Sequence, residues 1–175
     1  MLKYYDTAVT FAEFPDEIAL CINISNCPCR CSHCSEPWLR EDIGVELTAE
    51  EILRLLKANP HCTVIGLMGG DADHDDIIRI IDCIHANSNK KVGFYSGLDV
   101  IDMRIASCVD FYKIGRWIAP TGDPKDWYKH SCGPLVFPFS NQRYFERRGD
   151  QLYDATEKFR KAPLNDLQRY IVTEK

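Results

Sequence analysis

The feature that most constrains the fold is an alternation of strand-like and helix-like segments through the middle of the chain. Short apolar runs with the composition of buried strands are separated by segments whose apolar residues recur at helical spacing. We expect strands at residues 17–25, 62–68, 91–95 and 110–114, and helices at 48–59, 73–86 and 98–108. Strands that alternate with helices form parallel sheets with right-handed crossovers, so the sequence predicts an α/β fold.

Two of these helices carry recognisable start signals. Thr48 and Glu51 have the spacing of a capping box, in which each side chain bonds a backbone amide that the helix leaves unpaired. The acidic run 73–76 stands where negative side chains favour a helix N-terminus. We therefore interpret this run as a helix cap rather than as a site for a divalent metal.

The chain suits a single domain of 175 residues with a hairpin-like segment near each end. Residues 7–14 are strand-like, and Pro15-Asp16 joins them to the strand at 17–25. A second hairpin is expected from residues 142–146 and 151–154, followed by a helix at 164–172. The domain divides into an N-terminal hairpin (1–25), a cysteine loop (26–38), a βα core (48–120) and a tail (121–175).

Four of the nine cysteines crowd into eight residues of the loop that follows the strand at 17–25. Their order is Cys27-Pro-Cys29-Arg-Cys31-Ser-His-Cys34, and setting Cys29 aside leaves the spacing C-x3-C-x2-C. Three thiolates can hold three irons of a [4Fe–4S] cubane and leave the fourth iron open to another ligand. We expect Cys27, Cys31 and Cys34 to bind one cluster, with Cys29 packed beside it or dispensable.

A structural zinc site that uses all four cysteines is the alternative interpretation of this loop. Zinc sites usually pair two C-x2-C knuckles across an intervening segment, and no second knuckle follows here. The odd cysteine count also argues against a disulfide framework. Outside the loop, the cysteines that lie in apolar patterns and are expected in the core are Cys21, Cys62, Cys83 and Cys108, whereas Cys132 belongs to no motif.

The C-x3-C-x2-C loop after an early strand resembles the radical S-adenosylmethionine superfamily. Three runs narrow the resemblance: Asn-Ile-Ser-Asn-Cys-Pro-Cys-Arg-Cys at 23–31, Met-Gly-Gly-Asp at 68–71 and Phe-Tyr-Ser-Gly at 94–97. With the short length and the early hairpin, they look like the glycyl-radical-generating activating proteins of anaerobic (class III) ribonucleoside-triphosphate reductases. The resemblance covers residues 1–145 of the chain.

The resemblance implies a fold, a reaction and two protein partners. The fold is a partial or shortened (β/α) barrel. The open iron is chelated by the amino and carboxylate groups of S-adenosylmethionine, whose carbon–sulfur bond is cleaved by an electron from the reduced cluster. The resulting 5′-deoxyadenosyl radical takes a hydrogen atom from a glycine of the large reductase subunit. An electron donor such as flavodoxin or ferredoxin is implied as well.

Six residues near the expected cluster are candidates for contacting S-adenosylmethionine: His33, Ser35, Gly69, Gly70, Asp71 and Ser96. The glycines and Asp71 end a buried strand at the edge where barrels build their sites, and glycines allow close backbone approach. An ordinary strand-to-helix turn, with Asp71 or Asp73 as helix cap, is the alternative for residues 69–71. A solvent-facing loop is the alternative for His33, and a plain turn is the alternative for Ser96. Ser35 stands where the family often has asparagine. Lys113, at the end of the last core strand, is expected at the surface, with carboxylate binding as its alternative role.

Composition and charge narrow the classes of partner. The net charge is −5 and no run of five basic residues occurs, which argues against nucleic acid as the main partner. The apolar runs are too short to span a bilayer and no secretory signal is visible, so we expect a cytoplasmic protein without membrane contact. Two alternative functions stay open: a radical enzyme acting on a small molecule or another protein, and a zinc-stabilised binding module.

Overall fold

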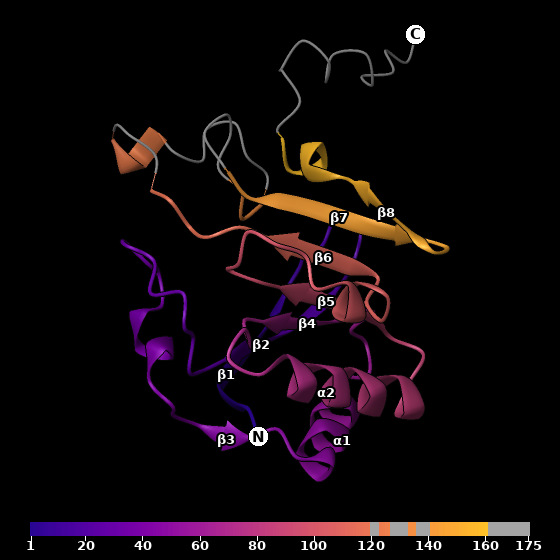
Figure 1. Ribbon diagram of the computed structural model, residues 1–175. Coiled ribbons are helices and arrows are strands. Elements are labelled where there is room, and N and C mark those ends of the chain that lie inside the picture. The colour runs from indigo at the N-terminus through magenta and orange to yellow at the C-terminus, as the bar shows by residue number, and fades with distance from the viewer. Residues whose placement is uncertain (120–122, 127–132, 136–140, 161–175) are drawn as a thin grey trace, which may run out of the picture.

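The computed structural model describes residues 1–119, 123–126, 133–135 and 141–160, and its centre is one mixed sheet of eight strands (Figure 1). The strand order is β3-β1-β2-β4-β5-β6-β7-β8. The strands are β1 (Lys3–Thr10), β2 (Ala19–Ile24), β3 (Val45–Glu46), β4 (Val64–Met68), β5 (Lys91–Tyr95), β6 (Phe111–Ile114), β7 (Arg143–Arg148) and β8 (Gln151–Asp154). Within the described residues the end strands β3 and β8 do not pair with each other, so the sheet is open.

The four central strands β2, β4, β5 and β6 run parallel, which confirms the predicted α/β class and its parallel core. Antiparallel strands flank this core on both sides: β1 and β3 before it, and β7 and β8 after it. Both expected hairpin pairings are present. The connection between β1 and β2 spans residues 11–18, however, and is longer than the predicted two-residue turn at Pro15-Asp16.

Helices α1 (Ala49–Ala58) and α2 (His74–Asn87) lie together against one side of the sheet (Figure 1). Both begin where the sequence predicts: the Thr48 hydroxyl accepts from the Glu51 amide at 3.2 Å, and Asp73 Oδ1 accepts from the Asp76 amide at 3.0 Å. Their apolar faces pack on the strands in one large core cluster. Cys62 and Cys21 are buried, and Cys83 and Cys108 are half-buried against this cluster.

On the opposite side of the sheet, the Phe14 ring packs within a second, smaller core cluster. Gly66 and Gly93 are paired neighbours on β4 and β5, and a Cβ atom on either glycine would collide with that ring. The ring centroid lies 5.0 Å from Tyr95 and 5.5 Å from Phe111. Two glycines in adjacent strands thus create the groove that seats an aromatic side chain from the β1–β2 connection.

The helix expected at 98–108 is reduced to the short α3 (Met103–Ala106). The Gly115 amide donates to the Leu98 carbonyl at 2.8 Å, and the Leu98 amide donates to the Ser96 hydroxyl at 3.0 Å. Because these bonds hold Leu98 at the strand ends, the helix starts only where Asp102 caps it. Three 3-10 turns were not expected: η1 (Pro37–Arg40), η2 (Pro124–Asp126) and η3 (Thr156–Phe159).

Two subjects of the sequence analysis fall outside the described residues, namely the helix expected at 164–172 and Cys132. None of the helices in the described ranges combines the length and the apolar character that crossing a bilayer requires.

Candidate functional site

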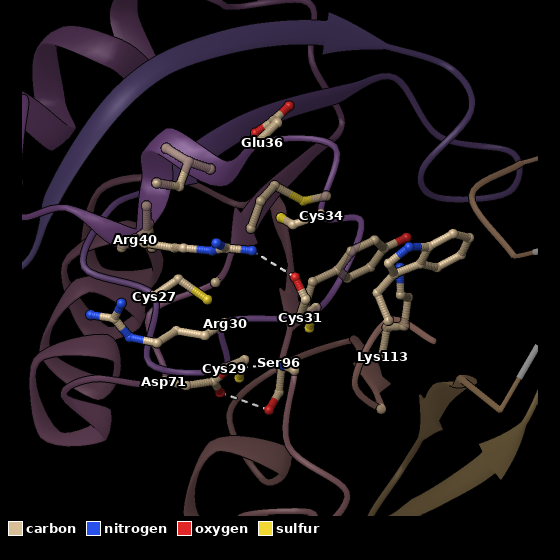
Figure 2. A pocket seen from close by; sticks show the side chains of 18 of the residues that line it. Cys27, Cys29, Arg30, Cys31, Cys34, Glu36, Arg40, Asp71, Ser96 and Lys113 are labelled. Atoms are coloured by element: carbon tan, nitrogen blue, oxygen red, sulfur yellow. Dashed lines mark hydrogen bonds between the residues drawn. The ribbon is translucent and has the colours of Figure 1, made fainter. Parts of the chain in front are cut away.

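A cavity opens at the C-terminal edge of the parallel strands, where the segments that follow four strands converge (Figure 2). The cysteine loop reaches it from the end of β2, Gly69 and Asp71 from β4, and Ser96 from β5. Crevices outside the carboxyl ends of parallel strands are where α/β proteins build binding sites. The cavity therefore lies where the sequence predicts a site.

All three predicted cluster ligands line this cavity. The Cys27, Cys31 and Cys34 side chains are each half-buried, and Figure 2 shows them around one space. The loop that carries them has a tight backbone, with positive φ angles of 62° at Asn26 and 46° at Arg30. Non-glycine residues adopt such angles rarely, and they persist where surrounding contacts enforce them.

Main-chain bonds to the following segment hold the start of this loop. The Asn26 amide donates to the Glu41 carbonyl at 2.9 Å, and the Cys27 amide donates to the Leu39 carbonyl at 2.8 Å. Leu39 lies in the η1 turn and Glu41 follows this turn directly, so η1 holds the start of the cysteine loop.

Cys29 differs from the other three cysteines of the loop. It is buried, and a Cβ atom on Gly97 would lie 2.5 Å from its sulfur. Its thiol donates to Asp71 Oδ2 at 3.6 Å. Burial, followed by the adjacent Asp71 carboxylate, raises the pKa of Cys29 to about 12. Burial also raises the pKa of Cys31, so the feature that singles out Cys29 is its bond to Asp71, which fits a thiol packed beside the other three.

The Asp71 carboxylate joins three segments of the cavity wall. Its side chain is only 1% exposed and accepts from the Ser96 hydroxyl and the Gly97 amide, both at 2.7 Å. With the bond from Cys29, it connects the turn after β4, the turn after β5 and the cysteine loop. Asp71 and Ser96 line the cavity, but their polar groups face each other. The structure thus gives Asp71 a positioning role.

The other candidate contacts divide between the cavity and its surroundings. Gly69 lines the cavity, with its amide bonded to the Tyr95 carbonyl at 2.9 Å. Gly70 is buried with φ of 108°, and a Cβ atom there would collide with Ile77 in the core. His33 and Ser35 are exposed and lie outside the set of lining residues. The structure therefore brings together Gly69, Asp71 and Ser96, but not the other three.

Lys113 corrects an expectation, since it is not at the surface. It is 8% exposed, lines the cavity and places its Nζ 4.3 Å from the Tyr95 ring centroid. Burial lowers the pKa of Lys113 to about 8, against an opposing contribution from Glu13. The available signal was its place in β6, a short strand whose neighbours Phe111 and Tyr112 are also buried.

Arg40 and Glu36 were also missed, and both line the cavity from the η1 region. Arg40 Nη2 donates to the Cys31 carbonyl at 2.6 Å, and its Nε is buried without a hydrogen-bond partner among the described residues. Burial, with the charges of Asp6 and Glu13, raises the pKa of Glu36. Trp38, in the same turn, is 46% exposed, whereas Trp117 lines the cavity.

The donor set can be compared with what different metals need. Among the described residues, no three His, Cys, Asp or Glu side chains converge closely enough to hold a single metal ion. In a cubane each cysteine binds a different iron, so its ligands surround a volume rather than meet at one point. Three half-buried thiols around a shared cavity, beside an arginine donor, fit such a cluster.

Comparisons of the chain with protein-family models, with curated proteins and with solved structures found no match. The geometry and chemistry of the site itself are therefore what indicate a function.

Proposed function

We propose that the protein is a radical S-adenosylmethionine activating enzyme that generates a glycyl radical on an anaerobic ribonucleoside-triphosphate reductase. One observation carries the proposal: the C-x3-C-x2-C thiols line one cavity at the C-terminal edge of parallel strands, while Cys29, which also lines it, is buried and donates to Asp71. The parallel core β2-β4-β5-β6 would then be a shortened form of the (β/α) barrel. The motif resemblance supports this assignment.

The residues of the cavity divide the work in this proposal. Cys27, Cys31 and Cys34 would hold a [4Fe–4S] cluster and leave one iron without a cysteine. The bound cluster and S-adenosylmethionine would supply a 5′-deoxyadenosyl radical. The Gly69 backbone would approach the cofactor closely, and the Lys113 ammonium, which lines the same cavity, would meet a carboxylate. Asp71 would hold the turns after β4 and β5 in place relative to each other.

The open sheet supports a protein substrate. A primary carbon radical must be shielded from water and from stray hydrogen donors. Because β3 and β8 leave the described sheet unclosed, a docked partner would complete the enclosure. We therefore assign the large reductase subunit as substrate and a flavodoxin or ferredoxin as electron donor.

The test is an anaerobic mixture of both proteins with reductant and S-adenosylmethionine, read by electron paramagnetic resonance. We expect a glycyl radical doublet on the reductase, with methionine and 5′-deoxyadenosine as products. The doublet should vanish when the acceptor glycine is replaced by alanine. Formation of 5′-deoxyadenosine without a radical on the reductase would contradict the partner assignment but not the radical chemistry.

A further inference from the structure

Arg40 occupies an unusual position for an arginine. Its Nη2 donates to the carbonyl of Cys31 at 2.6 Å, which fixes the guanidinium beside the cysteine loop (Figure 2). Its Nε is buried and has no hydrogen-bond partner within the described ranges. No carboxylate of the described residues forms an ion pair with it either, although Glu36 lines the same cavity. A half-buried positive charge therefore lines the cavity of the thiols and has no ion-pair partner among the described residues.

Such a charge has a direct consequence for an iron–sulfur cluster bound there. A cubane with three thiolates carries one net negative charge when oxidised and two when reduced. One-electron reduction thus adds negative charge beside a half-buried guanidinium whose Nε is shielded from water, where charges interact more strongly than in bulk solvent. Reduction potentials of these clusters respond to nearby charge, to hydrogen bonds and to solvent exposure.

We infer that Arg40 is a positioning residue that raises the reduction potential of the cluster, an inference that rests on the proposed function. Its Nη2 holds the Cys31 backbone, and its charge favours the reduced state that S-adenosylmethionine cleavage requires. The electron comes from a low-potential one-electron donor, and only the charge of the cluster changes. The Nε–H of Arg40, which has no partner among the described residues, is the donor that remains available for a sulfur of the bound cluster.

The test compares neutral and charged replacements with a control at a remote arginine. Arg40→Gln removes the positive charge, and Arg40→Lys keeps the charge but lacks the planar guanidinium with its several N–H donors. Arg79 is the matched control, because its Nη2 also donates to a carbonyl, that of Leu47 at 2.7 Å, but it does not line the cavity. Each protein is reconstituted anaerobically, assayed for iron and sulfide, and titrated with reductant while paramagnetic resonance follows the reduced cluster. S-adenosylmethionine and the partner protein are omitted, so no activity is measured.

We expect Arg40→Gln to lower the ratio of reduced to oxidised cluster at a fixed potential about tenfold, equivalent to about 59 mV for a one-electron couple. Arg79→Gln should leave the ratio unchanged, and Arg40→Lys should keep it within about threefold. An unchanged ratio in Arg40→Gln with full iron content overturns the inference. If Arg40→Gln loses its iron, the Arg40→Lys variant is decisive. A tenfold drop in its ratio of reduced to oxidised cluster, or the loss of its iron as well, also overturns the inference.

The proposed function fails separately in this experiment. It fails if the unmodified protein takes up no iron and sulfide, whatever the arginine variants do. A cluster that assembles normally, with a potential indifferent to Arg40, contradicts only the role of Arg40.

Discussion

Replacing Asp71 tests the architecture of the cavity wall most sharply. Its carboxylate is the shared acceptor for the Ser96 hydroxyl and the Gly97 amide, and it is almost fully shielded from solvent. A buried donor that loses its acceptor costs about 1–3 kcal/mol. Because Asp71→Ala leaves these two donors and the weaker Cys29 thiol without their acceptor, we expect it to lower the free energy of unfolding by about 2–6 kcal/mol.

Asp71→Asn should cost less, for a specific reason. The side-chain carbonyl oxygen of the asparagine can accept from the Gly97 amide, which can only donate. The amide nitrogen would then face Ser96, whose hydroxyl can rotate and accept instead. We expect a loss of about 1–2 kcal/mol for Asp71→Asn, between the wild type and Asp71→Ala.

The assay is urea unfolding of the cluster-free protein under reducing conditions, with linear extrapolation to water. Asp75→Ala is the control, because Asp75 lies in the first turn of α2 and pairs with Arg104 at 2.7 Å while 82% exposed. Exposed ion pairs contribute little to stability, so this variant should behave almost like the wild type. The reasoning about Asp71 is refuted if Asp71→Ala is no less stable than Asp75→Ala.

Three further predictions concern other positions. Gly70→Ala should lose at least about 2 kcal/mol of unfolding free energy in urea, because the φ angle of Gly70 is positive and Ile77 occupies the space of a Cβ atom. Gly149→Ala is the control, with a positive φ angle but open space around the Cβ position, and should lose about 1 kcal/mol. Cys29→Ala should retain full iron and sulfide after anaerobic reconstitution, whereas Cys31→Ala should lose the intact cluster. Lys113→Met should stabilise the protein at pH 7 by up to about 3 kcal/mol in the same urea assay. The pKa of Lys113 is lowered from 10.5 to about 8, so the folded state disfavours its proton, and this gain should fade as pH rises from 8 to 10.5.

Each of these has a result that would contradict it. Equal losses at Gly70 and Gly149 would show that the contact with Ile77 is not limiting. Loss of iron from Cys29→Ala would make Cys29 a ligand. A Lys113→Met protein no more stable than the wild type at pH 7 would show that the ammonium is solvated.

The parallel core was predictable because its signals are local. The caps at Thr48 and Asp73 depend on residues three positions apart, and each buried strand is a short apolar run. The short α3 was not predictable from pattern alone. Main-chain bonds hold Leu98 at the ends of the strands, and those bonds exist only once the sheet has formed.

The candidate site was predictable only in part, for a related reason. Spacing alone singled out Cys27, Cys31 and Cys34, and the cavity now contains all three. Arg40 gave no local signal, and the place of Lys113 in a short apolar strand was outweighed because a charged side chain at a strand end or in a turn is normally solvated. The burial of Lys113 follows from segments distant in sequence that approach it, such as the one that includes Glu13.

The central claim is that three cysteines of one loop hold a four-iron cluster. Iron, acid-labile sulfide and zinc should be measured in protein purified and reconstituted without oxygen. The account predicts four irons and four sulfides per chain, lost together in Cys27→Ala, Cys31→Ala and Cys34→Ala. One zinc per chain with no iron, under the same conditions, would contradict it.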